Sequence, residues 1–374
     1  MRILVCPPAH FGVDYVINPW MEGQIGLVDR ARAHAQWSAL FDDVARSASV
    51  SEVAPINGSP DMVFTANAAL VSGRRAVPAR FRMPERQTEE SHFIDWFRAN
   101  AFDVVSIGES DPFEGEGDAL FQPGQPLLWA GYGVRTALET HVALAAAFET
   151  EVVSLRLVDQ RFYHLDTCFA PLPGGRVMYY PAAFDERSRH EIEARIPADR
   201  RLEVSDADAM GFACNVLRVD ERLFLNSASD TLRDGLADWG FEARVHPVDE
   251  FLKAGGGVKC LSLILDQLEV PENDASPLVP ASPIRAAQIE LAGHLLDDGL
   301  LRSALDIVTD GCGSFRVDRL DLAERKDQAS RTSLRVVAPN ESLLDQIIDR
   351  LGQLGATPIE LASSERASLS PQRA

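Results

Sequence analysis

The segment DALFQPGQPLLWAGYG, residues 118–133, contains two apolar runs separated by a turn rich in proline and glycine, followed by small residues. This pattern predicts a β-hairpin. The same pattern recurs in MVFTANAALVSGRRAVPARF (62–81), TCFAPLPGGRVMYYPAAF (167–184) and CNVLRVDERLFLNSAS (214–229). Successive units begin roughly 50 residues apart, a spacing typical of an array or propeller of supersecondary units.

A fifth unit would be completed where KCLSLILDQL (259–268) lies. Helical patterns, such as SHFIDWFRAN (91–100) and ETHVALAAAFE (139–149), stand between the hairpins, so each unit combines a hairpin with a helix. Five units that close on themselves would bring their strand ends to one central site. The alternative is that hairpins recur by chance, as they do in any α/β chain. We predict an α+β protein whose residues 1–268 form a fivefold pseudo-symmetric α/β-propeller.

A different composition begins at EVPENDASPLVPASP (269–283), where proline, serine and alanine indicate a linker. Residues 284–362 then show strand and helix patterns in the order β-α-β-β-α-β, which is the ferredoxin-like order. Asn340 is placed to cap the second helix, which we expect to end near Gly355. Residues 363–374 have the composition of a disordered tail. We expect the small domain to bind a regulator or a partner and to carry no catalytic residues.

Length and composition fit a globular protein with one large and one smaller domain, since the chain has 374 residues, 46% of them hydrophobic and 25% charged. The net charge of −20 argues against a nucleic-acid partner and would help to attract a cationic substrate, although most of the charges suit a solvated acidic surface. No apolar run reaches membrane-spanning length, and the N-terminus lacks the anatomy of a signal peptide. We therefore expect a cytoplasmic protein without a membrane partner.

The five cysteines are odd in number and widely spaced, with no CxxC motif. This argues against a disulfide framework and a zinc ribbon, and it favours free thiols in a reducing compartment. Cys260 follows three glycines and Lys259, and the run LSLILDQL after it has a helical pattern. A helix N-terminus favours a thiolate. Taken alone, however, a buried cysteine is more often a small apolar residue.

Three further motifs carry polar groups of the kind that perform catalysis. In YHLDT, His164 and Asp166 are two residues apart, so on a strand they would face one site. FEGEGDAL and PDMVFTAN carry further acids and an amide, at Glu114, Glu116, Asp118, Asp61 and Asn67. A lone histidine is more often structural, and these acids also suit a solvated turn or a hard cation, although EGEGD lacks the ligand pattern of an EF-hand loop.

The combination of these groups is more specific than any one of them. A cysteine, a histidine and several carboxylates at the ends of repeated strands suit covalent catalysis with acid and base assistance. Several acids around one cysteine favour a planar, cationic group, and a guanidinium fits because its N–H fork matches carboxylates.

Residues 1–268 resemble the pentein superfamily of guanidine-modifying enzymes. The motifs FTAN, EGEGD, GYGVRT, YHLDT and GGGVKC carry the resemblance in that order. The superfamily has a fivefold α/β-propeller and includes arginine deiminases, dimethylarginine dimethylaminohydrolases, amidinotransferases and arginine dihydrolases. The C-terminal part is similar to the small domain of lysine-ketoglutarate reductase/saccharopine dehydrogenase-type proteins, a fusion similar to the arginine dihydrolase type. Longer relatives continue into a nicotinamide-dependent module, but this sequence has no dinucleotide fingerprint, so we expect no NAD chemistry.

The resemblance implies a role for each matching residue. Cys260 would be the nucleophile, His164 the general acid and base, and Asp166 a ligand of a guanidino nitrogen. Because EGEGD has one residue more than the common EGGD, either Glu114 or Glu116 could pair with His164 or with the substrate, and we favour Glu114. The remaining implied substrate contacts are Asp118, Arg86, Arg135 and Asn18, with the two arginines holding the substrate carboxylate.

Asn67 is the most informative departure, because deiminases typically read FTRD where this chain reads FTAN. An aspartate favours the charged guanidinium, whereas an asparagine both donates and accepts and therefore also suits a neutral urea. The resemblance thus favours an arginine dihydrolase, which releases ornithine, carbon dioxide and two ammonia molecules without a metal or cofactor. A deiminase or dimethylarginine hydrolase giving citrulline, an amidinotransferase, and a non-catalytic binding module remain alternatives. Relatives suggest a homo-oligomer.

Overall fold

The computed structural model describes residues 1–108, 111–267, 285–296, 299–323 and 328–359. Within this part of the chain there are two compact units, one of residues 1–136 and 155–267 and one of residues 137–154 and 285–359. The predicted linker, 269–283, and the predicted tail, 363–374, lie outside the described residues. The predicted domain boundaries stay a prediction.

Strands β1 to β15 form five sheets of three strands each. The first four sheets follow one another along the chain: β3 (Ala69–Ser72), β4 (Arg75–Pro78), β5 (Asp103–Val104); β6 (Ala119–Phe121), β7 (Leu127–Tyr132), β8 (Glu151–Arg156); β9 (Phe169–Leu172), β10 (Arg176–Tyr179), β11 (Arg201–Glu203); β12 (Leu217–Val219), β13 (Arg222–Leu225), β14 (Glu242–Val245). Each contains one of the predicted hairpins. In the sheets of β3, β9 and β12 the middle strand is antiparallel to the first and parallel to the third.

The fifth sheet joins the two ends of the large predicted domain. Strand β15 (Leu263–Ile264) pairs antiparallel with β1 (Arg2–Val5), and β1 pairs parallel with β2 (Ser49–Glu52). The expected helix LSLILDQL is therefore wrong in its described part: residues 258–261 form a turn and a strand follows. A short apolar run does not distinguish helix from strand by its own pattern, and here a partner more than 250 residues away decides.

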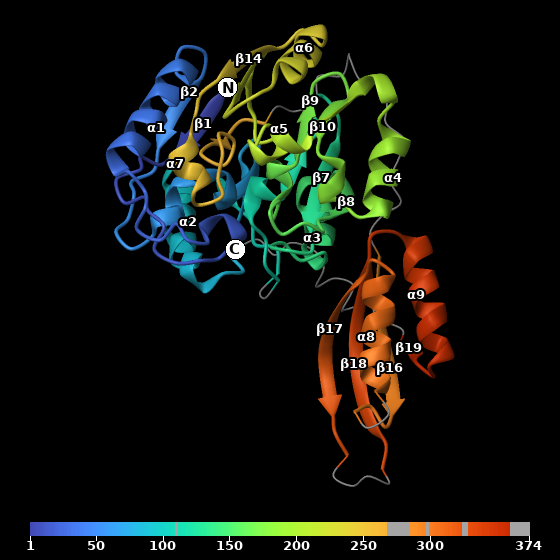
Figure 1. Ribbon diagram of the computed structural model, residues 1–374. Helices are drawn as coiled ribbons and strands as arrows, with labels where there is room; N and C mark the ends of the chain where they lie inside the picture. The colour runs from blue at the N-terminus through green and yellow to red at the C-terminus, as the bar shows by residue number, and fades with distance from the viewer. Residues whose placement is uncertain (109–110, 268–284, 297–298, 324–327, 360–374) are drawn as a thin grey trace. The chain divides into compact units, whose positions relative to one another are not determined.

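Helices connect the strands, and the helices predicted at 91–100 and 139–149 are α2 and α3. The helices up to β15 are α1 (Arg30–Val44), α2 (Thr88–Ala99), α3 (Glu139–Phe148), α4 (Glu186–Arg195), α5 (Asp206–Met210), α6 (Asp230–Asp238) and α7 (Asp249–Leu252). Helices α1 and α7 lie side by side, and the Gln36 side chain accepts a hydrogen bond from Glu250 N at 3.1 Å (Figure 1). None of the described helices combines the length and apolar character needed to cross a membrane.

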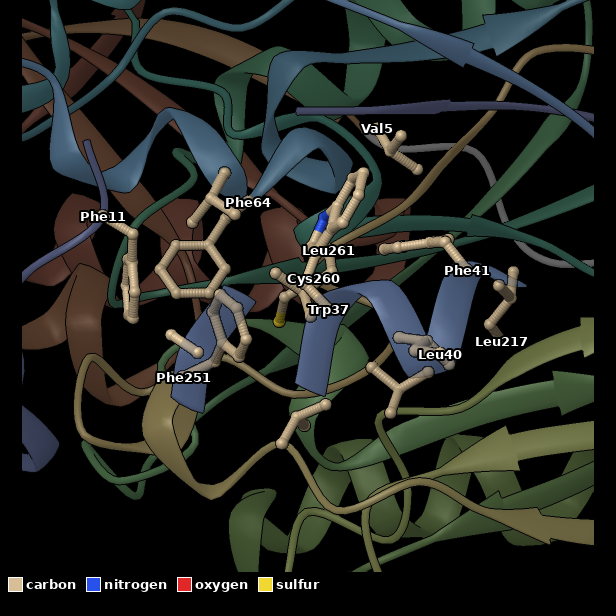
Figure 2. Close-up of a cluster of buried hydrophobic side chains, with 14 of the residues drawn as sticks. Val5, Phe11, Trp37, Leu40, Phe41, Phe64, Leu217, Phe251, Cys260 and Leu261 are labelled. Carbon is tan, nitrogen blue, oxygen red and sulfur yellow. The ribbon is translucent and has the colours of Figure 1, made fainter. Parts of the chain in front are cut away.

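Cys260 belongs to a core cluster of aromatic and aliphatic side chains that come from distant parts of the chain (Figure 2). The Phe11 ring stacks on Phe251 with centroids 4.6 Å apart and meets Phe64 edge to face at 5.9 Å. Strand β1 contributes Val5 and Ile3 to the same cluster. Burial of these side chains is the main stabilising contribution at this place, and it fixes the segment that carries Cys260.

The three glycines before Cys260 are required because the chain passes too close to its neighbours for any side chain. A Cβ on Gly256 would lie 2.1 Å from the Phe64 ring, and a Cβ on Gly257 would lie 2.7 Å from Asn215 Oδ1. Gly255 has φ +81°, and a Cβ there would lie 2.8 Å from the Tyr163 hydroxyl. The glycines thus let the segment lie directly against other side chains.

The C-terminal part of the second unit, residues 285–359, has the predicted order of helices and strands. Its elements are β16 (Arg285–Gly293), α8 (Leu300–Asp310), β17 (Ser314–Asp321), β18 (Ser330–Ala338), α9 (Glu341–Gln353) and β19 (Thr357–Ile359). The sheet order is β17-β18-β16-β19 and all three pairings are antiparallel. The predicted N-cap is confirmed, since the Asn340 side chain accepts a hydrogen bond from Leu343 N at 3.0 Å.

Replacement of Gly256 by alanine should lower the free energy of unfolding by about 1–3 kcal/mol, because the added methyl group overpacks a filled core. Denaturant unfolding of the purified protein measures this. Gly12→Ala is the matched control: a Cβ at Gly12 would lie 3.4 Å from its nearest neighbour, so it needs no displacement. Equal stabilities of the two variants would contradict the close approach at Phe64.

Candidate active site

The turn that precedes the first strand of each hairpin carries the candidate residues. Three of these turns are 3-10 helices, η3 (Thr65–Ala68), η5 (Gly115–Gly117) and η6 (Leu165–Thr167), and two are the turns at 211–214 and 258–261. Glu116, Asp166 and Cys260 each lie three residues before the strand that follows. The repeated backbone therefore delivers different side chains from equivalent places.

Cys260 is buried between two polar side chains. Asn215 Nδ2 donates to Cys260 Sγ at 3.1 Å, Asn215 Oδ1 accepts from Cys260 N at 3.1 Å, and the thiol lies 3.5 Å from Asp166 Oδ2. Burial, followed by the Asp166 carboxylate, raises the pKa of Cys260 well above its ordinary value. The expected thiolate at a helix start is therefore wrong: there is no helix here to stabilise it, and the thiol is favoured until a cation arrives.

Asp166 lies in η6 and not on a strand, so the expected alternation of His164 and Asp166 along a strand is also wrong. Its Oδ1 atom is buried and has no hydrogen-bond partner among the described residues. Burial raises the pKa of Asp166 to about 7, although the positive charge of Lys259 opposes the rise. A buried carboxylate with a free oxygen beside a thiol is a place that a cationic ligand would fill.

Glu114, and not Glu116, contacts His164. Glu114 Oε2 lies 2.7 Å from His164 Nε2 and 3.3 Å from Arg135 Nη1, and all three side chains are buried. Burial alone would raise the pKa of Glu114, but the Arg135 guanidinium and the hydrogen bond from His164 outweigh it and hold the pKa at about 2. A fixed carboxylate orients the imidazole, which is what an acid–base histidine requires.

Glu116 points to a different partner, Lys259. The Lys259 Nζ atom lies 2.5 Å from Glu116 Oε2, which also accepts from Ile264 N at 3.2 Å. The two glutamates of EGEGD thus separate, one to the histidine and one to the lysine next to the cysteine.

Both carboxylate oxygens of Asp118 accept hydrogen bonds from other groups of the protein. Oδ2 accepts from Thr136 Oγ1 at 2.7 Å and Oδ1 accepts from Leu165 N at 3.0 Å, so Asp118 fixes the start of η6 beside His164. Burial raises the pKa of Asp118 to about 6. Its predicted contact with substrate stays a prediction.

Asn67 bridges a buried arginine and the histidine. Its Oδ1 accepts from Arg86 Nη1 at 2.8 Å, and its Nδ2 lies 3.4 Å from His164 Nδ1. Arg86 also binds Glu89 through two parallel hydrogen bonds of 2.9 and 2.8 Å and donates to Asp61 O. Most donors of Arg86 are therefore engaged within the protein, and its predicted contact with a substrate carboxylate stays a prediction.

The remaining predicted residues lie around the same place. Arg135 donates to Ile17 O at 2.8 Å and lies over the Tyr163 ring. Asn18 Nδ2 donates to Ala254 O at 3.0 Å, and its Oδ1 accepts from Trp20 N at 2.9 Å. The nitrogen and the oxygen of the Asn18 side-chain amide thus both bind backbone, the nitrogen at Ala254, which directly precedes the glycine segment.

Asp61 is the second acid of the site with a carboxylate oxygen that has no partner among the described residues. Its Oδ2 accepts from the Tyr15 hydroxyl at 3.0 Å, while its buried Oδ1 has no partner in the described part of the chain. Burial raises the pKa of Asp61. The sequence drew attention to Asp61 without giving it a role.

The sequence reasoning missed Asn215, which holds Cys260 directly. A signal existed: Asn215 lies two residues before β12, as Asn67 lies two residues before β3. Superposing the units on their hairpins would have found it. Glu89 and Tyr15, which bind Arg86 and Asp61, left no such signal because they lie outside the repeated turns. Among the described residues, no group of three or more His, Cys, Asp or Glu side chains is arranged to hold a metal ion.

Comparison with known families matches residues 286–373 to a model described as the LOR/SDH bifunctional enzyme conserved region. This match covers the C-terminal segment only.

Comparison with known proteins extends over the whole chain. The bifunctional arginine dihydrolase/ornithine cyclodeaminase ArgZ of Synechocystis is 48% identical over 96% of this chain and 50% of its own length. The N(G),N(G)-dimethylarginine dimethylaminohydrolase of Mycobacterium tuberculosis is 40% identical over 70% of this chain and 85% of its own length. A solved N-terminal domain of ArgZ, an asparagine-to-serine variant covalently bound to a reaction intermediate, is 51% identical with a TM-score of 0.70 and covers 72% of this chain and 99% of that domain. The chain spans about half the length of its full-length bifunctional relatives.

Asp166→Asn should stabilise the fold more at pH 8 than at pH 5, by on the order of 2 kcal/mol. The pKa of Asp166 is about 7 in the folded protein against an ordinary value of 3.8. The protonated carboxyl therefore favours the folded state at low pH, and this contribution is lost as the pH rises through 7. Asparagine removes that loss, which thermal unfolding at the two pH values measures.

The control is Asp159→Asn, at a half-buried aspartate whose pKa the Arg161 hydrogen bond lowers. This variant should gain no stability at pH 8. A gain of Asp166→Asn that does not depend on pH would contradict the buried, uncompensated carboxylate.

Proposed function

The chain belongs to the pentein superfamily of guanidine-modifying enzymes, with dimethylarginine dimethylaminohydrolase and arginine dihydrolase domains among its relatives, and we propose that it hydrolyses the guanidino group of L-arginine. The observation that carries this proposal is the buried Asp166 Oδ1, which has no partner in the part of the chain that the structure describes and whose sister oxygen lies 3.5 Å from Cys260 Sγ. A guanidinium bound there satisfies the carboxylate and places its carbon at the sulfur.

The binding step prepares the nucleophile. A guanidinium next to Cys260 adds a positive charge beside the sulfur, so it lowers the pKa of the Cys260 thiol, which burial and Asp166 raise. Asn215 Nδ2 already donates to Sγ and stabilises the thiolate once it forms.

As the thiolate of Cys260 forms and attacks the guanidino carbon, the thiol proton is taken up by His164, which Glu114 holds. His164 then gives this proton to one nitrogen, which leaves as ammonia and produces a covalent thiouronium. Water that has given a proton to His164 attacks the same carbon, and the carbon–sulfur bond breaks to give citrulline. A covalent intermediate in the ArgZ domain supports this route. No step of it needs a metal or a cofactor.

A second round on citrulline completes the dihydrolase reaction. Cys260 attacks the ureido carbon, ammonia leaves again, and water releases a carbamate that decomposes to ornithine and carbon dioxide. Asn67 lies 3.4 Å from His164 through its Nδ2, which can donate to the urea oxygen where an aspartate would repel it. This favours two rounds over one.

The other end of the substrate requires an anion for its ammonium group and cations for its carboxylate. The unpartnered Asp61 Oδ1 suits the ammonium group. In the contacts of the described residues, Arg86 Nη1 and Arg135 Nη1 each use one of their two N–H groups, and we assign the other to the carboxylate. Asn18 shapes the backbone beside them. Asp118, which the sequence predicted as a substrate contact, would support the His164 segment through Leu165 N and Thr136.

We further propose that the five three-stranded sheets form the fivefold propeller of the superfamily, within residues 1–268, and that residues 284–362 form a ferredoxin-like domain. The sheet order β17-β18-β16-β19 supports the latter. A homo-oligomeric, cytoplasmic enzyme follows from the resemblance, and a reducing compartment agrees with the five cysteines, none of which forms a disulfide among the described residues.

Incubation with L-arginine should yield ornithine and ammonia in a ratio of one to two, and Cys260→Ser should lower turnover by at least about a thousandfold because the nucleophile is lost. The control is Cys312→Ser, at a half-buried cysteine of the second unit. Residual turnover of Cys260→Ser near the wild-type rate would exclude the covalent route.

Dimethylarginine is the second candidate substrate, because the mycobacterial relative that the chain covers to 85% bears that name. A parallel assay with asymmetric dimethylarginine decides between the two. A higher kcat/KM for dimethylarginine, with citrulline as the end product, would replace the dihydrolase proposal.

Asn67→Asp should shift the product from ornithine toward citrulline. The added carboxylate favours the cationic guanidinium and disfavours the neutral ureido group, so the second round slows. Chromatographic quantification of both products measures the ratio. If Asn67→Asp gave the wild-type ratio, Asn67 would have no part in the second round.

A further inference from the structure

The side chains of Lys259 and Glu116 form a buried ion pair directly behind the nucleophile. Lys259 Nζ lies 2.5 Å from Glu116 Oε2 and donates to Ser262 O at 3.0 Å. Both side chains are buried: Lys259 is 5% exposed and Glu116 is fully buried. A buried pair is costly to desolvate, so its retention behind a catalytic cysteine calls for a functional reason.

Glu116 connects the cysteine segment to η5 through more than the lysine. Its Oε2 accepts from Ile264 N at 3.2 Å, and its Oε1 accepts from the Gln267 side chain. Three groups that surround Cys260 in sequence therefore converge on one carboxylate, two residues from the Glu114 that holds His164. One short segment thus fixes both the nucleophile and the acid–base histidine.

Lys259 directly precedes Cys260, whose Sγ atom lies 3.5 Å from Oδ2 of Asp166, the proposed guanidinium ligand, so the ion pair stands next to the segment that contacts this carboxylate. The titratable groups that act on Asp166 are Lys259 and Cys260 on the turn at 258–261 and Glu116 on η5, while Tyr163 and Cys168 on its own segment are in turn affected by its charge. Lys259 is the cation among them. It opposes the effect of burial on the pKa of Asp166 more strongly than Glu116 adds to it.

We propose that Lys259 and Glu116 are positioning residues: Glu116 holds the Cys260 segment against η5, and Lys259 keeps Asp166 in its anionic form for the guanidinium. The inference rests on the proposed function. The positive charge acts through Asp166 and does not itself touch the reacting atoms. The pair therefore sets the lowest pH at which the enzyme binds arginine.

The test replaces both members together, as Glu116→Gln with Lys259→Met, because removal of one member alone leaves an uncompensated buried charge. The acid limb of the pH profile of kcat/KM for arginine should move to higher pH by about one unit. A merely structural tether would lower kcat/KM at every pH and leave the limb in place. An unmoved limb would overturn the inference.

Two further variants separate the charge from the shape. Lys259→Arg keeps the cation and should keep the wild-type acid limb. Glu250→Gln with Lys253→Met is the matched control, since this other ion pair of 2.6 Å lies in the same unit and its double replacement also leaves the net charge unchanged. It should keep the wild-type acid limb, and a shift in this control would show that the loss of any ion pair in the unit moves the limb, which would overturn the inference.

A measurement without turnover keeps the inference separate from the proposed function. The thermal midpoint is followed from pH 5 to pH 9 for the wild type and the double variant, each with and without Asp166→Asn. The loss of stability with rising pH should continue to higher pH in the double variant, and Asp166→Asn should abolish the difference. Identical curves would overturn the inference, whereas absence of arginine hydrolysis by the wild type would contradict only the proposed function.

Discussion

The pairing of β15 with β1 is the contact on which the site depends. Leu263 and Ile264 follow Cys260 almost directly, and their pairing with Leu4 and Ile3 in the sheet fixes the Cys260 segment to the N-terminal strand. Because β1 also pairs with β2, the fifth sheet is assembled from both ends of the first unit. The cluster around Phe11, Phe64 and Phe251 then encloses the segment with apolar side chains. The three glycines are the consequence of this close packing.

The second constraint is electrostatic. Several carboxylates lie buried in one place, and the protein compensates them unequally. Glu114 pairs with Arg135 and His164. Glu116 pairs with Lys259, and Glu89 pairs with Arg86. Asp61 and Asp166 each keep an oxygen without a partner among the described residues. The uncompensated oxygens are the ones that a dipolar, cationic substrate such as arginine would complete, which is the physical basis of the proposed specificity.

The hairpins were predictable because each is local, with two apolar runs around a turn, and the same holds for the Asn340 cap. The element that failed was LSLILDQL, whose pattern fits helix and strand equally and whose partner is the N-terminal strand. The prediction of a Cys260 thiolate was wrong for the same reason, because it assumed that a helix begins at Cys260. Asp166 was placed near Cys260 by resemblance, but its position on a 3-10 turn follows from the shared backbone of the five turns.

The sequence by itself determined the repeat, the order of the small unit and the kinds of group at the site, because local patterns and motif order carry that information. Only the tertiary structure decided which glutamate meets the histidine and which meets the lysine. Glu114 and Glu116 differ by two residues in the same motif, and their partners, His164 and Lys259, are brought to them by turns from other sheets. Asn215 likewise became a partner of Cys260 through folding alone. Charge compensation among buried groups depends on distances across the chain, and no local pattern contains those distances.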